Sequence, residues 1–507
     1  MMREDKSLMM KRILPIASLG LALAVVATAC DNSKLTDVNK NPNAPENVSP
    51  ELLFPAAAVS SVRAVRSSIE ITPSAFAHWP QFLSEYQYAE ISYYQFRPTT
   101  SDSWWLTFYA GPLQDLQQVL TQTIAAKHPN ETGPALVMRA FDYSTMTGLW
   151  GDIPFGEANK GADNFTPVYD TQQAIYDSLL TNLSDANTMM AGGDNTYGSR
   201  DPIYGGDVTK WKKLANSLRA RLGMNLSKVD PARAKTEVAA AFAAGGMASN
   251  DDIAQISWPG DAINDNPWYD NQKDGIGTRD DARFSVTFID TLKHLNDPRL
   301  PVFARPVQDP TCGTVPNCTP VAAGDYRGMP NGLLPGDAGS WGPKSSRLGP
   351  QVFAGDQPSY IMTYAEYEFI LAEAAERGWI AGSAATFYQN GIRASMEQWG
   401  VADADIATYL AQPRVAYAGG TAGLAQIGVQ KWISLFTQGY EAWSEWRRTG
   451  YPNLTPALNA KTSDGQIPRR VLYPQTEQSF NNAHLQAAIT SQGGSDALNK
   501  RLWIDKL

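Results

Sequence analysis

Apolar side chains recur at steps of three or four residues along several long segments, and this spacing constrains the fold more than any other feature of the sequence. The clearest stripes lie within residues 175–190, 211–226 and 361–379. Asp170-Thr171 and Asp207 precede the first two stripes and are residue types that cap helix N-termini. Because a 3.6-residue period places such side chains on one helix face, we expect a mostly helical chain that packs through these faces.

Further helices are predicted from the same spacing within residues 50–66, 104–126, 133–150, 384–399 and 432–446. Two adjacent antiparallel helices joined by a short turn are the unit of tetratricopeptide-like solenoids, and residues 364–399 fit that unit. The sequence therefore predicts an all-α fold of tetratricopeptide-like helical hairpins, although a repeat signature of about 34 residues is not cleanly repeated.

Residues 251–357 differ from the rest of the chain. They are rich in Pro, Gly, Asp and Asn and show a helical period only within residues 285–295. We interpret this region as a large irregular, loop-rich insertion over the helical frame. Such loops carry binding more often than packing, because a rigid scaffold presents them to solvent.

The first residues of the sequence are typical of an export signal. A short basic head, residues 10–12, is followed by an apolar stretch over residues 13–27 that is too short to be a spanning helix, so residues 1–29 are predicted to be a signal peptide. The run Val-Ala-Thr-Ala-Cys that ends at Cys30 resembles the bacterial lipobox, in which the cysteine becomes the lipid-bearing first residue. We expect lipidation of Cys30 and a polar tether over residues 30–48, ahead of one domain over residues 49–507. A plain signal peptide with an incidental cysteine is the alternative.

Cys312 and Cys318 remain once Cys30 carries a lipid. They lie close together in a stretch rich in Pro and Gly, and an exported protein meets an oxidising compartment, so a small loop disulfide is expected, with two free thiols as the alternative. A metal site at these cysteines would need further ligands nearby, and His294 is remote in sequence, so no metal site is predicted.

Charge and motifs exclude several functions. The chain has 42 Lys and Arg against 51 Asp and Glu, a formal net charge of −9, and no basic cluster that would bind a phosphate backbone, so no nucleic-acid partner is expected. The sequence also lacks the zinc, phosphate-loop and dinucleotide motifs and the serine nucleophile elbow. We therefore predict neither a cofactor nor an enzymatic activity.

An oxygen-rich run in the insertion raises the question of calcium, which favours such ligands in a flexible loop. The run consists of Asp261, Asn264, Asp265, Asn266, Asp270, Asn271 and Asp274. Its spacing is not that of an EF-hand loop, and a polar loop with turn-forming side chains is the simpler interpretation.

Aromatic planes are the binding chemistry that the sequence offers, because sugar rings have apolar faces that stack on them and peptides also use aromatic walls. One candidate cluster is Trp79, Tyr93, Tyr94, Trp104 and Trp105. A second group, in the irregular region where we expect rings to be less completely buried, is Trp258, Trp268, Tyr269 and Trp341. We predict ligand binding by the second group, so that Trp268→Ala or Trp341→Ala weakens binding without unfolding the protein. Ordinary core packing is the alternative for each ring.

Several segments match, in order, one family of known proteins. They are residues 37–45 with 49–53, 150–158 with 167 and 169–171, 204–207 with 211, 297–300, 364–367 with 372–374, 427–447 and 468–474. Each segment is short, but together they run from the start of the chain to near its C-terminus. The chain resembles the SusD/RagB-like nutrient-binding lipoproteins.

The resemblance implies an all-α lipoprotein that is lipid-anchored on the surface of the outer membrane in the Bacteroidota. It also implies binding of a glycan, oligosaccharide or peptide and its delivery to a SusC-like TonB-dependent transporter. It does not identify the ligand or the ligand-contact residues. A lipid-anchored glycan hydrolase, which would need two carboxylates held across a bond, and a surface scaffold for protein interactions are the alternatives.

Overall fold

The computed structural model describes residues 48–70, 75–261, 263–271 and 279–506, and its helical body begins at Pro50. The predicted signal peptide, Cys30 and most of the tether lie outside the described residues, as does Asp274. Among the residues that are described, no helix is both long and apolar enough to cross a bilayer.

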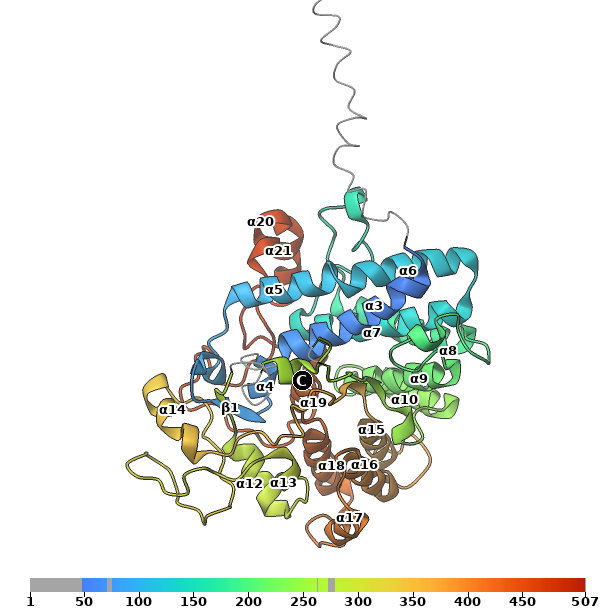
Figure 1. Ribbon diagram of the computed structural model, residues 1–507. Helices are drawn as coiled ribbons and strands as arrows, with labels where there is room; N and C mark the ends of the chain where they lie inside the picture. Colours follow the sequence, from blue (N-terminus) through green and yellow to red (C-terminus); the bar gives the residue numbers. More distant parts are fainter. Residues whose placement is uncertain (1–47, 71–74, 262, 272–278, 507) are drawn as a thin grey trace, which may run out of the picture. The chain divides into compact units, whose positions relative to one another are not determined.

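The first half of the body is a stack of helices that follow one another in sequence (Figure 1). Helices neighbouring in this series pack against each other. The series consists of α3 (Pro50–Arg63), α6 (Pro112–Ala126), α7 (Pro129–Trp150), α8 (Gln172–Met189), α9 (Val208–Asn225) and α10 (Pro231–Ala244). α7 is buried over most of its length, as expected for a helix in the middle of a stack.

The second half supplies another hairpin, α15 (Tyr364–Glu376) with α16 (Ala384–Gln398), which packs on α18 (Gly420–Ser434). α19 (Gly439–Thr449) follows, and α15 also contacts α9 of the first stack. α17 (Asp403–Leu410), α20 (Gln475–Phe480) and α21 (Asn482–Ser491) are shorter. The predicted all-α fold of helical hairpins is confirmed.

The predicted helix starts agree with the structure where a local capping bond sets them. Thr171 Oγ1 accepts a hydrogen bond from the Ala174 amide at 3.3 Å, and Asp207 Oδ1 accepts one from the Lys210 amide at 3.1 Å. Ser285 does the same for α12 (Val286–Leu295). Each bond satisfies an amide that the first helical turn leaves without a partner.

Two segments that the sequence predicts as single helices are each broken. Residues 104–126 divide into α5 (Pro98–Tyr109) and α6, because Pro112 starts a new helix and a Cβ at Gly111 would lie 2.5 Å from the Thr107 carbonyl oxygen. Residues 432–446 divide between α18 and α19. A Cβ at Gly439 would collide with the carbonyl oxygen of Phe76, so a contact distant in sequence requires glycine where α19 starts.

The irregular region is fixed to the helical frame by two short antiparallel strand pairs. β3 (Ala282–Phe284) pairs with β1 (Leu83–Glu85), with Leu83 opposite Phe284 and Glu85 opposite Ala282. β2 (Ala254–Ile256) pairs with β4 (Ser359–Met362), so Ile361 lies in a strand and not at the start of the predicted helical stripe. Between the strands lie the short helices α11 (Pro267–Asn271), α13 (Leu300–Phe303) and α14 (Pro335–Trp341).

Cys312 and Cys318 are joined by a disulfide in this region. The Arg327 guanidinium lies beside it and donates to the Thr319 carbonyl oxygen at 2.7 Å and to that of Asp309 at 2.8 Å. One buried arginine thus donates hydrogen bonds to several backbone carbonyl groups of a loop that is not part of a paired strand.

Candidate ligand-binding site

The tryptophans predicted to bind ligand are buried. Trp258, Trp268 and Trp341 are only 6%, 6% and 3% exposed, and Tyr269 is half-buried. The expectation that these loop indoles are exposed is therefore wrong, because the two strand pairs hold the irregular region against the core and its rings join that core. Ligand binding by these four residues stays a prediction.

The first aromatic cluster is also core. Trp79, Tyr93, Tyr94, Trp104 and Trp105 are all buried. The Tyr94 hydroxyl accepts a hydrogen bond from the Ala457 amide at 2.9 Å, and burial raises the pKa of Tyr94 to about 12. This tyrosine anchors its loop rather than presenting a ring to solvent.

The oxygen-rich run makes local turns in the part of the chain that is described. Asp261 Oδ1 accepts from the amides of Ile263 and Asn264 at 3.1 and 2.9 Å. Asn266 Oδ1 accepts from the Trp268 amide at 2.7 Å. Within the described ranges, no group of three or more His, Cys, Asp or Glu side chains could hold a metal ion.

Tyr88 is an exposed aromatic side chain that lines a cavity. It is 65% exposed and lines a hollow of about 220 Å³. The other lining residues are Ala75, Glu90, Ile91, Gln95, Arg97, Thr100 and Arg279. An exposed ring surrounded by charged and amide side chains is the combination that a sugar requires, with an apolar plane for one face and polar partners for the hydroxyls.

The backbone that carries Tyr88 is held in an uncommon conformation. The short helix η2 (Ala89–Tyr93) lies between two residues in the left-handed region, Tyr88 with φ 53° and Tyr94 with φ 69°. Such conformations are disfavoured for bulky residues and cluster at binding and catalytic sites. The Lys461 amide donates to the Tyr93 carbonyl oxygen at 2.8 Å and ties this loop to the C-terminal part of the chain.

Arg279 also lines the hollow and comes from the irregular region. Its guanidinium carbon lies 5.0 Å from the centre of the Tyr88 ring, and its Nη2 lies 2.5 Å from Asp281 Oδ2. At the rim, Arg97 Nη2 lies 3.9 Å from Glu90 Oε1. A guanidinium therefore lies over the ring of a tyrosine that stays mostly exposed.

Residue pattern alone did not single out Tyr88, Glu90, Arg97 or Arg279. The signal was present as a polar stretch with closely spaced tyrosines over residues 86–97. Sequence reasoning selected Tyr93 and Tyr94 from that stretch, but their rings turn into the core. Tyr88 is exposed while Tyr93 and Tyr94 are buried, and no local pattern shows this difference.

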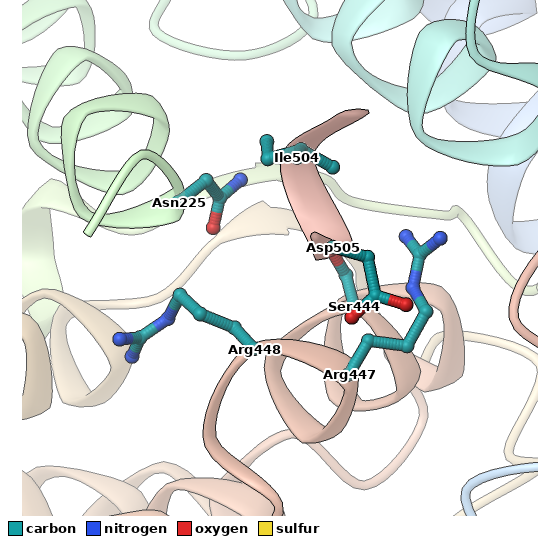
Figure 2. Close-up of a pocket in the computed structure, with 6 residues that line it drawn as sticks. All are labelled: Asn225, Ser444, Arg447, Arg448, Ile504 and Asp505. Atoms are coloured by element: carbon teal, nitrogen blue, oxygen red, sulfur yellow. The ribbon is translucent and has the colours of Figure 1, made fainter. Parts of the chain in front are cut away.

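Two other cavities fit a ligand less well. A groove of about 460 Å³ between α12 and α18 has Tyr388 as its aromatic ring, and that ring is almost fully buried. Figure 2 shows a cavity beside α19, from which Arg447 and Arg448 extend in opposite directions. Its volume of about 10 Å³ suits a single water molecule.

Residues 42–474 match the model of a SusD-like family described as starch-binding and associating with the outer membrane. The chain belongs to the SusD-like family. Proteins of this family are binding proteins and not enzymes. None of the curated proteins matches the chain significantly.

Solved structures of SusD homologues share the fold. A chitin-binding protein is 31% identical, with a TM-score of 0.77, over 89% of this chain and 100% of its own length. A chitin-binding SusD homologue from Flavobacterium johnsoniae is 25% identical, with a TM-score of 0.77 and coverage of 90% and 98%. A SusD-like protein described as Bacteroidetes AC2a is 26% identical, with a TM-score of 0.74 and coverage of 91% and 100%.

Proposed function

We propose that this SusD-like protein captures a glycan at the Tyr88 hollow and delivers it to a SusC-like TonB-dependent transporter in the outer membrane, where a lipid on Cys30 anchors it. The observation that carries the proposal is the exposed Tyr88 ring with polar side chains around it, in a chain whose 31%-identical structural relative is a chitin-binding protein.

The chemistry of the hollow favours a sugar over an apolar ligand. A pyranose ring covers one aromatic face, and its hydroxyl or acetamido groups need donors and acceptors within reach. Arg97 and Arg279 supply donors, Glu90 supplies acceptors, and Gln95 and Thr100 supply both. Capture of this kind needs no covalent step, and it suits an open hollow at the protein surface.

Titration calorimetry with chito-oligosaccharides tests the proposal, with malto-oligosaccharides and a peptide mixture as comparison ligands. We expect binding of a chito-oligosaccharide and at least a roughly tenfold loss in Tyr88→Ala, because stacking on an aromatic anchor is a dominant contact. Phe480→Ala is the matched control, since Phe480 is an exposed ring that does not line this hollow. Binding of peptides alone, or full affinity in Tyr88→Ala, would contradict the proposal.

The anchor and the partner need separate measurements. A Cys30→Ser variant should lose incorporation of labelled fatty acid and leave the membrane fraction, because a thiol is required for lipid attachment. An affinity-tagged wild-type chain, extracted in mild detergent, should co-purify with a TonB-dependent transporter. A Cys30→Ser variant that stays in the membrane fraction would contradict the lipid anchor. A wild-type chain that purifies alone would contradict the transporter partner.

A further inference from the structure

Four titratable side chains, His78, Glu85, Asp281 and Arg279, interact with one another beside the Tyr88 ring. His78 Nε2 lies 3.3 Å from Glu85 Oε1, and both side chains are almost fully buried. Asp281, also buried, lies on the neighbouring strand segment and holds Arg279. Arg279 is the one of these four that is only half-buried, and it lies over Tyr88.

The strand pair brings these groups together. Glu85 is opposite Ala282 in the β1–β3 register, and the Tyr86 amide donates to the Asp281 carbonyl oxygen at 2.9 Å. The two carboxylates are close enough to interact. Burial raises the pKa of Glu85, His78 lowers it, and Asp281 raises it again. The backbone of Asp281 is therefore tied to that of Tyr86 directly beside the strand pair, while its side chain forms an ion pair with Arg279.

We propose that Asp281 is a positioning residue for ligand binding, because it holds the Arg279 guanidinium over Tyr88 and so fixes the ring before a sugar arrives. Asp281 lines no part of the hollow and needs no contact with ligand. An exposed tyrosine side chain loses rotational freedom when a ligand binds, and this loss of entropy weakens binding. A ring that is already held in place avoids most of that entropy cost. The inference rests on the proposed function for the role of the ring, but the packing of Asp281, Arg279 and Tyr88 can be tested without a ligand.

The chain offers a matched control one residue away. Asp280 has the same charge, but it pairs with Arg283, with Nη1 3.1 Å from Oδ1, and the Arg283 guanidinium lies 4.3 Å from the ring centre of Tyr86. Tyr86 does not line the hollow. Asp280→Asn therefore removes a negative charge from the neighbouring position, just before β3, without releasing the arginine over Tyr88.

The first measurement is ligand-free. In protein labelled with ¹³C at the tyrosine rings, and with the Tyr88 signal assigned by Tyr88→Phe, Asp281→Asn should move that signal in the same direction as Arg279→Ala, while Asp280→Asn leaves it in place. An unmoved Tyr88 signal in Asp281→Asn overturns the proposal. If Asp281→Asn does not fold, Arg279→Ala decides alone, and an unmoved signal there overturns the proposal equally.

The second measurement is affinity for a chito-oligosaccharide. Asp281→Asn should weaken binding about three- to tenfold in the wild-type background and have no effect in an Arg279→Ala background, because the aspartate acts through the arginine. Equal losses in both backgrounds, or wild-type affinity in Asp281→Asn, overturn the positioning role. Failure of the proposed function gives a different result. Tyr88→Ala would then bind the sugar like wild type, while the Tyr88 signal still moves in Asp281→Asn and in Arg279→Ala.

Discussion

Arg448 of α19 and Glu373 of α15 form a bidentate ion pair inside the helical frame, with Nη1 2.7 Å from Oε1 and Nη2 2.5 Å from Oε2. Both side chains are buried. Arg448 also contacts Glu445, which pairs with Lys431 of α18 at 3.0 Å. Arg377 also pairs with Glu373, with its Nη2 2.8 Å from Oε1, so two acids and three bases join α15, α18 and α19.

Removal of one carboxylate from this cluster should be costly. Glu373→Gln leaves Arg448 buried with less than its full complement of negative charge, and we expect the free energy of unfolding at pH 7 to fall by about 3–5 kcal/mol. Urea unfolding followed by circular dichroism gives the value. Glu397→Gln is the control, because Glu397 lies 3.9 Å from Arg393 in an exposed pair, and its loss should cost less than about 1 kcal/mol. Similar losses in both variants would contradict the prediction.

The same pair predicts a stability change in acid. Burial raises the pKa of Glu373, but Arg448 outweighs it and lowers the pKa from 4.5 to about 2. Because the folded state holds this carboxylate ionised at lower pH than the unfolded chain does, its contribution is complete above pH 4.5 and is lost as the pH falls towards 2. The free energy of unfolding should therefore fall more steeply in wild type than in Glu373→Gln between pH 4.5 and 2. Parallel curves would show that Glu373 does not carry this dependence.

The parts of the fold that sequence predicts are those with local causes. Thr171, Asp207 and Ser285 cap helices through bonds to amides three residues on, so the residue type and position suffice. The need for glycine at position 439 could not be predicted from nearby residues, because it comes from the backbone of Phe76. Burial of Trp268 and exposure of Tyr88 likewise depend on tertiary packing. A composition that indicates loops does not show which face of each loop meets solvent.

A buried acid elsewhere in the frame gives a pH dependence of opposite sign. Ser61 Oγ of α3 donates to Asp142 Oδ2 of α7 at 2.7 Å, and Asp142 Oδ1 is buried without a hydrogen-bond partner. Burial raises the pKa of Asp142 well above its ordinary 3.8, only partly offset by Ser61. The folded state therefore holds a proton that the unfolded chain releases, so this group costs stability as the pH rises above 3.8.

Asp142→Asn removes that titration and keeps the shape of the side chain. We expect the variant to be more stable than wild type at pH 7, by about 1 kcal/mol or more, and the difference to shrink towards zero as the pH approaches 4. Urea unfolding at several pH values measures it. A difference that stays constant from pH 4 to pH 7 would mean that folding does not raise the pKa of Asp142.

A comparison of variants at Trp268 and Tyr88 distinguishes a residue that packs in the core from one that binds ligand. Trp268 is buried and lines a small internal cavity with Phe76 and Phe82, so Trp268→Ala should cost about 3–5 kcal/mol of unfolding free energy. Tyr88 is mostly exposed, so Tyr88→Ala should change that free energy by only about 0.5 kcal/mol while affinity for the sugar is lost. Thermal unfolding and calorimetry on the same preparations distinguish the two effects. A stable Trp268→Ala variant with weakened binding would instead indicate that the ligand binds at the tryptophans predicted from the sequence.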